Sequence, residues 1–185
     1  LVCKNVFPTI PLKFWNDKKN VKFKEAYFNK FNNIWHHGDY AEVNNSGGFI
    51  IYGRSDTTLN PGGVRLGTSE IYSEVEKFKE IKESLVIGQS WDNDIRIILF
   101  VVMNQNYQLN HELIRRIKLQ IKTNASPRHV PGKILSVKDI PRTKNGKIVE
   151  LAVKNIIEGN KIKNKEALAN PEILNEFRNL NELKY

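Results

Sequence analysis

The stretch Ile95–Met103, IRIILFVVM, gives the clearest indication of the fold in this chain of 185 residues. It is apolar at nearly every position and partly β-branched, which is typical of a strand buried inside a sheet. A helix is expected after it, because Asn110 can cap a segment in which apolar residues from Leu113 to Ile121 recur at helical spacing. A central strand followed by an amphipathic helix therefore forms the core of the predicted domain.

Further strands and helices are expected to alternate around this pair. The sequence predicts a helix over Ser69–Lys79, strands over Ser84–Ile87 and Lys133–Ile140, a helix over Ile148–Ile157 and a short helix from Pro171. Residues 1 to about 53 are rich in Phe, Trp, Pro and Asn, and they indicate β segments and loops. The predicted class is α/β (α+β), with a central mixed sheet flanked by helices and preceded by a β-rich part.

The loop Pro141–Lys147, PRTKNGK, joins the last predicted strand to the helix that follows it. Pro141 fixes its own φ, and the pair Asn145-Gly146 accepts the φ > 0 positions of a tight turn, so Lys147 is presented with little backbone freedom. One ammonium group on a long stem suits a moving phosphate oxygen, whose developing charge it can stabilise. The alternative is an ordinary surface turn before a helix.

A second unusual segment begins where the apolar run Phe49–Tyr52 ends. Gly53-Arg54-Ser55-Asp56 follows that run, and NPGGVRLG (Asn60–Gly67) comes shortly after it. The pattern is typical of a strand, a hinge and a glycine-rich hairpin, in which Gly62 and Gly63 let a ligand approach the backbone. A bulged hairpin turn without a ligand is the alternative.

Together the two segments resemble the adenylate-forming acyl-CoA synthetase and ligase superfamily. In that superfamily a Gly-Arg-x-Asp hinge motif and a Pro-x-Thr-x-x-Gly-Lys loop flank a small C-terminal domain, as Gly53–Asp56 and Pro141–Lys147 do here. In addition, His37-Gly38-Asp39 stands where the superfamily has a Thr-Gly-Asp ribose-binding motif. The resemblance implies that residues 1–55 are the β-rich C-terminal edge of a large N-terminal domain, and that residues 56–185 form a mobile C-terminal domain with its hinge at Asp56.

Three further stretches look most like the branch of the superfamily that activates acetoacetate: Phe14–Asp17, Gly62–Thr68 with Glu70–Tyr72, and Ala167–Glu172. This resemblance implies ATP-dependent ligation of acetoacetate to coenzyme A through an acyl-adenylate, with release of AMP and pyrophosphate. The family's enzymes are several times longer, and their Ser/Thr/Gly-rich phosphate loop is not found in this sequence. The chain is therefore expected to be a C-terminal piece that needs the N-terminal domain of the same protein and is inactive alone.

The resemblance also assigns roles to individual residues. Lys147 would be catalytic, bridging the carboxylate and the α-phosphate in the first half-reaction. ATP or AMP would be bound by Asp39, Arg54 and Arg65, and coenzyme A by Gly63, Lys122 and Arg128. Mg²⁺ would accompany ATP, with no metal ligand assigned in this chain.

Composition and charge limit the classes of binding partner that this chain can have. The formal net charge of +9 is compatible with nucleic acid, a membrane surface or a polyanionic cofactor. Nucleic acid is not expected, because the basic stretches from Arg115 onward lack interleaved aromatic residues, and no apolar run approaches the length of a membrane span. The adjacent pair His36-His37 lacks further ligands for a metal site, and the single cysteine, Cys3, favours a reducing, cytoplasmic setting.

Two other functions stay open at this point. The enzyme could act on another short-chain acid such as acetate or propionate, because no residue of this chain is expected to contact the acid's side chain. The chain could also be a basic binding module without catalytic activity.

Overall fold

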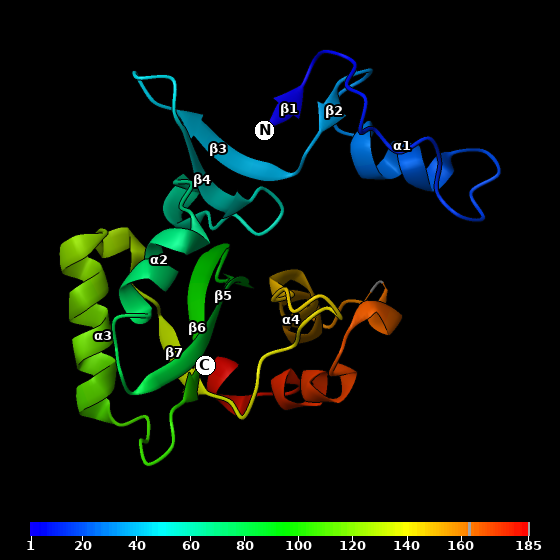
Figure 1. Cartoon of the computed structure of the whole chain (residues 1–185). Helices are drawn as coiled ribbons and strands as arrows, with labels where there is room; N and C mark the ends of the chain where they lie inside the picture. The colour runs from blue at the N-terminus through cyan, green and yellow to red at the C-terminus, as the bar shows by residue number, and fades with distance from the viewer. Residues whose placement is uncertain (163, 185) are drawn as a thin grey trace. The chain divides into compact units, whose positions relative to one another are not determined.

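The computed structural model of the protein describes residues 1–162 and 164–184 (Figure 1). The chain divides into two compact units, Leu1–Asp56 and Thr57–Tyr185. The division falls one residue after the expected boundary, so Asp56 is the last residue of the first unit. The predicted hinge and the lysine loop consequently belong to different units.

The first unit consists of two antiparallel strand pairs and one helix. Its elements are β1 (Val2–Cys3), α1 (Val21–Tyr27), β2 (Trp35–His36), β3 (Asp39–Val43) and β4 (Phe49–Arg54). Strand β1 pairs with β2, and β3 pairs with β4. The β segments expected in this part are confirmed, and the apolar run Phe49–Tyr52 forms most of β4.

Helix α1 is not predicted from the sequence. The carboxylate of Asp17 accepts hydrogen bonds from the backbone N–H groups of Val21 and Phe23, both at 2.9 Å, and so satisfies donors at the start of the helix. The ring of Tyr27 stacks on buried Trp35, with ring centroids 3.7 Å apart. Lys22 and Lys24 flank Phe23 in the sequence, and these charged residues conceal the helical periodicity.

The second unit is built on a three-stranded mixed sheet. Its strands are β5 (Ile81–Trp91), β6 (Asp94–Met103) and β7 (Lys133–Ser136), in the order β5-β6-β7. Strand β6 pairs antiparallel with β5 and parallel with β7. The prediction that Ile95–Met103 is the central strand of a mixed sheet is confirmed.

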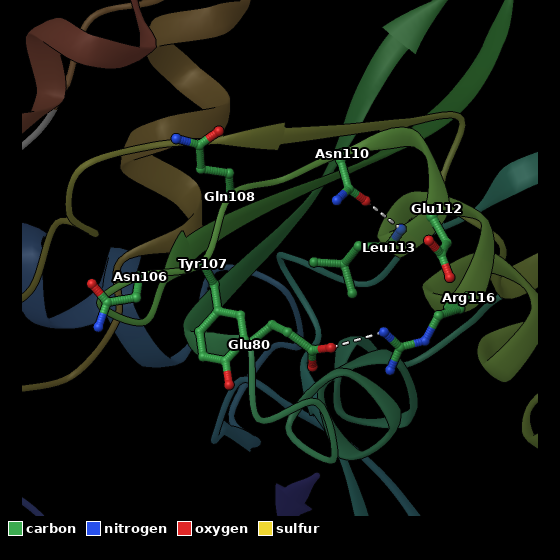
Figure 2. A pocket seen from close by; sticks show the side chains of 8 residues that line it. All are labelled: Glu80, Asn106, Tyr107, Gln108, Asn110, Glu112, Leu113 and Arg116. Carbon is green, nitrogen blue, oxygen red and sulfur yellow. Dashed lines mark hydrogen bonds and ion pairs between the residues drawn. The ribbon is translucent and has the colours of Figure 1, made fainter.

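Helices and 3-10 turns complete this unit. The α-helices are α2 (Thr68–Val75), α3 (His111–Asn124) and α4 (Glu150–Ile157), and the 3-10 segments are η1 (Pro61–Gly63), η2 (Pro127–His129), η3 (Lys165–Ala167), η4 (Pro171–Phe177) and η5 (Asn181–Leu183). The predicted cap of α3 is confirmed, because Oδ1 of Asn110 accepts the N–H of Leu113 at 2.8 Å (Figure 2). The predicted short helix at Pro171 is a 3-10 helix rather than an α-helix.

The two faces of the sheet bury two separate apolar cores. Strand residues with alternating parity point to opposite faces, as in any pleated strand. One core combines Val86, Ile97, Leu99 and Val101 with α2 and α3, and the other combines Leu85, Ile87, Ile98, Phe100 and Val102 with α4 and the C-terminal 3-10 segments. Figure 1 shows α2 and α3 on one side of the sheet and α4 on the other. Each fully buried Leu, Ile or Phe stabilises this arrangement by about 1.5–3 kcal/mol.

A hydrogen-bonded tyrosine covers the free edge of β5. The hydroxyl oxygen of Tyr72, on α2, accepts the backbone N–H of Val86 at 3.0 Å and donates its proton to the carboxylate of Glu150 on α4. Burial, together with the negative charge of Glu150, raises the pKa of Tyr72 well above its usual value. Helices from both faces of the sheet are thereby joined at its edge strand, and the N–H of Val86 on that edge is paired.

None of the helices in the described part of the chain combines the length and the apolar character needed to cross a membrane.

Candidate functional site

The lysine loop is a tight turn followed by an exposed Lys147. The N–H of Gly146 donates to the carbonyl of Thr143 at 2.8 Å, and the N–H of Thr143 donates to the carbonyl of Lys147 at 2.8 Å. Gly146 takes φ +78°, whereas Asn145 does not take a positive φ, so the glycine alone provides the left-handed position. The side-chain hydroxyl of Thr143 also accepts the N–H of Lys147 at 3.1 Å. The backbone around the lysine is therefore fixed on both sides of the turn, while its side chain faces solvent.

The glycine-rich hairpin is closed by backbone hydrogen bonds between Leu59 and Leu66, at 3.1 and 2.9 Å. Gly62 and Gly63 at its tip have φ angles of +56° and +77°, which lie in the left-handed region that favours glycine. Around Gly63 there is open space, because a Cβ added there would meet no atom within 4 Å. The tip thus offers bare backbone to a ligand, and Arg65 lies on its exposed side.

Asp94 holds this hairpin and was not singled out from the sequence. Its two carboxylate oxygens accept the N–H of Gly62 at 2.8 and 3.0 Å. Hydrogen bonds from the backbone N–H groups of Ile95 and Gly62 lower the pKa of Asp94. The preceding pair Asp92-Asn93, both at positive φ, is typical of a two-residue hairpin turn, and that signal could have located Asp94 at the start of a strand.

The two candidate coenzyme A cations lie at and beyond the C-terminal end of α3. Lys122 is in the last turn of that helix, and Arg128 is in η2; both side chains are exposed. Arg128 reaches the glycine hairpin, since its Nη1 lies 4.0 Å from the position that a Cβ on Gly62 would occupy. The structure therefore brings Arg128 beside the hairpin, which gives it a closer connection to Gly63 than the sequence alone could indicate.

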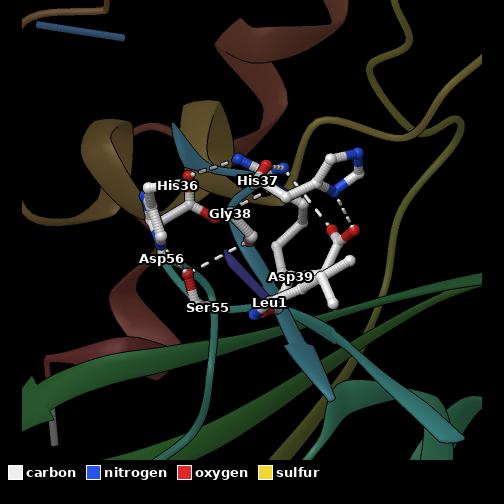
Figure 3. Close-up of polar contacts among 8 residues, drawn as sticks. Leu1, His36, His37, Gly38, Asp39, Ser55 and Asp56 are labelled. Atoms are coloured by element: carbon white, nitrogen blue, oxygen red, sulfur yellow. Dashed lines mark hydrogen bonds and ion pairs between the residues drawn. The ribbon is translucent and has the colours of Figure 1, made fainter. Parts of the chain in front are cut away.

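In the first unit, Asp39 and Arg54 meet at the paired ends of β3 and β4. Oδ1 of Asp39 lies 3.5 Å from Nη1 of Arg54, which also donates to the carbonyl of His37 at 3.1 Å. The other oxygen of Asp39 contacts Nδ1 of His37 at 2.6 Å. Gly38 makes room for the arginine: a Cβ there would lie 2.4 Å from the guanidinium. Figure 3 shows His37, Gly38 and Asp39 close together.

Asp56 continues the same network. Nε of Arg54 donates to Oδ1 of Asp56 at 3.3 Å, and Nη2 donates to Oδ2 at 3.4 Å. The neighbouring Ser55 donates through its N–H and its hydroxyl to the carbonyl of Gly38, at 2.8 and 3.1 Å (Figure 3). The predicted hinge residue is thus tied to the candidate nucleotide-binding arginine, and its role as a pivot stays a prediction.

The adjacent histidines have separate partners. Nε2 of His36 lies 3.4 Å from the hydroxyl of Ser55, and His37 contacts Asp39. Partial burial, followed by the positive charge of Lys30, lowers the pKa of His36 and so favours its neutral imidazole. Within residues 1–162 and 164–184, no three His, Cys, Asp or Glu side chains come together as ligands for a metal ion.

One hollow on the second unit contains none of the predicted site residues. It has a volume of about 540 Å³ and is lined by Glu80, by Leu113 and by polar side chains from the start of α3 and the loop before it. The carboxylate of Glu80 accepts a hydrogen bond from Arg116 at 2.8 Å (Figure 2). The ion pair and the backbone N–H of Glu80 itself lower the pKa of that carboxyl group. Because its lining contains none of the predicted site residues, we do not assign this hollow to the candidate site.

Comparison with known proteins identifies the relatives of the chain. A scan against protein-family models finds no match. The acetoacetyl-coenzyme A synthetase of Rhizobium meliloti (strain 1021) is 56% identical over 184 residues, which cover 100% of this chain and 28% of that protein. The chain thus spans little more than a quarter of the length of the curated relatives that it matches.

Solved structures agree with the sequence comparison. The acetoacetyl-CoA synthetase of Streptomyces lividans matches 100% of this chain and 28% of its own, with a TM-score of 0.90 and 36% identity. An anthranilate CoA ligase in complex with anthranoyl-AMP covers 74% of this chain and 26% of its own, with a TM-score of 0.63 and 25% identity. In sequence and fold, the whole chain is therefore the counterpart of the C-terminal part of the acetoacetyl-CoA synthetases.

Proposed function

We propose that this chain is the C-terminal part of an enzyme that ligates acetoacetate to coenzyme A, using ATP and forming acetoacetyl-adenylate as the intermediate. The observation that carries the proposal is the rigid turn that presents Lys147, in a chain 56% identical to an acetoacetyl-coenzyme A synthetase. In the first half-reaction a carboxylate oxygen attacks the α-phosphorus of ATP, and the bond to pyrophosphate breaks. In the second, the thiol of coenzyme A attacks the acyl carbon, and AMP leaves.

Lys147 would act in the first half-reaction. The attacking carboxylate and the α-phosphate are both anions, and one ammonium group between them offsets their repulsion and stabilises the charge that develops in the transition state. The turn is held by three backbone or hydroxyl contacts between Thr143 and the segment ending at Lys147. Because the backbone of the turn is fixed, the flexible side chain of Lys147 can bring its ammonium group to one place.

Asp39, Arg54 and Arg65 would bind the nucleotide. A carboxylate can accept hydrogen bonds from both hydroxyls of a ribose, and Asp39 keeps lone pairs for this purpose beyond those that His37 and Arg54 engage. Arg54 holds Asp39 in place and adds positive charge to the site. The exposed side chain of Arg65 would contact the phosphates of ATP, and Mg²⁺ would accompany ATP without a ligand from this chain.

The glycine hairpin would serve the second half-reaction. Asp56 is the proposed pivot, at which the backbone changes so that the lysine loop withdraws and Gly63 takes its place beside the thiol. The open space around Gly63 supports this role, since a side chain there would occupy the path of the thiol. Lys122 and Arg128 are the cations proposed to bind the phosphates of coenzyme A.

The first unit would be completed by a larger N-terminal domain. Val43, Phe49, Ile50 and Ile51 on the β3-β4 pair are between 41% and 64% exposed, which is a large apolar surface for such a small sheet. The relatives are several times longer than this chain. A domain supplied by the rest of the protein would cover this surface and provide the acid-binding pocket.

Steady-state turnover of the full-length protein tests this function. Acetoacetate should give ATP-dependent release of AMP and pyrophosphate and formation of a thioester, with a higher kcat/KM than acetate or propionate. A purified sample of residues 1–185 should release no pyrophosphate. A higher kcat/KM for acetate or propionate would assign another acid. Absence of adenylation with all three acids, combined with salt-dependent binding to generic polyanions, would indicate a basic binding module.

A further inference from the structure

The turn that carries Lys147 is held from the side by an arginine next to its start. Nη1 of Arg142 donates to the carbonyl of Gly146 at 3.0 Å. That carbonyl belongs to the peptide group directly before Lys147, so the guanidinium fixes the plane from which the lysine leaves the turn. The contact spans the base of the loop and is independent of the turn's own hydrogen bonds.

Glu83 on β5 fixes the guanidinium in turn. Its Oε2 lies 2.7 Å from Nη2 of Arg142, and both side chains are a little over a quarter exposed, at 28% and 29%. The arginine therefore uses one nitrogen for the sheet and another for the loop, in the planar fork that a lysine cannot reproduce. Through the contacts of Arg142 with Glu83 and with the carbonyl of Gly146, the backbone before Lys147 is connected to edge strand β5.

The C-terminal segment holds the backbone of the same arginine. The N–H of Arg142 donates to Oδ1 of Asn170 at 2.9 Å, and its carbonyl accepts the N–H of Ala169 at 2.8 Å. Nδ2 of Asn170 donates to the carbonyl of Ile140 at 3.0 Å. Asn170 belongs to the stretch Ala167–Glu172, for which the proposed function gives no role. With its backbone fixed in this way, Arg142 has little freedom except at its side chain.

We propose that Arg142, oriented by Glu83, is a positioning residue for Lys147 in acyl-adenylate formation, an inference that rests on the proposed function. Arg142 touches neither substrate in this account; it acts by placing the lysine. Placement matters because a shift of about 1 Å in a group that aligns two reactants can cost about a hundredfold in rate. The ion pair itself is partly exposed and contributes little to stability, so its loss should leave the fold intact.

Four variants of the full-length enzyme separate placement from folding: Arg142→Gln, Arg142→Lys, Glu83→Gln and the double variant Glu83→Gln/Arg142→Gln. Arg142→Gln should lower the rate of ATP–pyrophosphate exchange with acetoacetate by about tenfold to a hundredfold. Thioester formation from supplied acetoacetyl-adenylate should change less than twofold. Arg142→Lys should restore part of the exchange rate, and the double variant should be no slower than Arg142→Gln, because Glu83 acts through Arg142.

Two controls complete the experiment. Arg115→Gln removes an exposed arginine from α3 and should leave both half-reactions unchanged. Lys147→Ala should abolish most of the exchange. The inference alone would be overturned if Arg142→Gln slowed both half-reactions equally. It would also be overturned if Arg142→Gln left the exchange rate unchanged while Lys147→Ala lowered it. Full exchange activity in Lys147→Ala would instead overturn the proposed function, and the inference with it.

Discussion

Replacing Tyr72 with Phe should destabilise the second unit by about 2–3 kcal/mol, although only one oxygen is removed. That oxygen accepts the N–H of Val86 at 3.0 Å and carries the proton donated to Glu150. A buried N–H left without an acceptor costs about 1–3 kcal/mol, and a hydrogen bond to a charged group contributes about 1.5–3 kcal/mol. The two contributions overlap, because water can reach part of the carboxylate once the hydroxyl is gone, so the expected total lies below their sum.

Amide hydrogen exchange of β6 measures this effect, because the slowest amides of the central strand report the free energy of unfolding of this unit. Tyr107→Phe is the matched control, since Tyr107 lies in the loop after β6 and is 40% exposed. The control should change the unfolding free energy by no more than about 0.5 kcal/mol. If Tyr72→Phe cost no more than the control, the tyrosine would not be what secures the sheet edge, and the account of how α2 and α4 are joined would be wrong.

Three further changes test other parts of the account. Because folding raises the pKa of Tyr72, the stability that its neutral hydroxyl contributes is fully present below the unfolded value of 10.0 and is lost as the pH rises above that value. Amide hydrogen exchange measured from pH 9 to 11 should show this loss of stability. The Tyr72→Phe variant should not show the pH dependence. Gly38→Ala should displace the guanidinium of Arg54 and raise the Kd for ATP by about tenfold or more in calorimetric titrations of the full-length enzyme. Gly47→Ala is the control, because Gly47 also has a positive φ but a Cβ there would meet no atom within 4 Å. This control should leave the Kd unchanged. Gly63→Leu should block thioester formation from supplied acetoacetyl-adenylate and spare pyrophosphate exchange; equal inhibition of both, or the same inhibition by Gly47→Leu, would contradict the role of the hairpin.

The parts of the fold that the sequence predicts are those fixed by local chemistry. The apolar run Ile95–Met103 needs burial on both faces, which only a central strand provides, and Asn110 caps the helix that follows it. The extent of β5 is underestimated, because its polar ends resemble a loop until they pair with β6 along the full register from Ile81 to Trp91. Helix α1 is missed because charged residues flank its aromatic side chains, and the stacking of Tyr27 on Trp35 forms only in the folded unit.

The candidate site shows the same division. The motif around Lys147 and the glycines of the hairpin are recognisable because backbone geometry restricts which residues can stand there. Glu83 and Asp94 are not recognisable, because their partners Arg142 and Gly62 are far away in the chain and only the folded sheet brings each pair together. The sequence around a carboxylate on a strand does not indicate which loop that carboxylate will contact.

We propose that Lys147 acts in the adenylation half-reaction and not in thioester formation. Single-turnover rates of the two half-reactions in full-length Lys147→Ala test this role, with acetoacetate and ATP in one experiment and supplied acetoacetyl-adenylate and coenzyme A in the other. Loss of a preorganised charge should raise the adenylation barrier by about 3 kcal/mol or more, which is a factor of at least about a hundred in rate, while the thioester rate stays within about twofold of the unmodified enzyme. Equal losses in the two rates would contradict the account and would make Lys147 a structural residue.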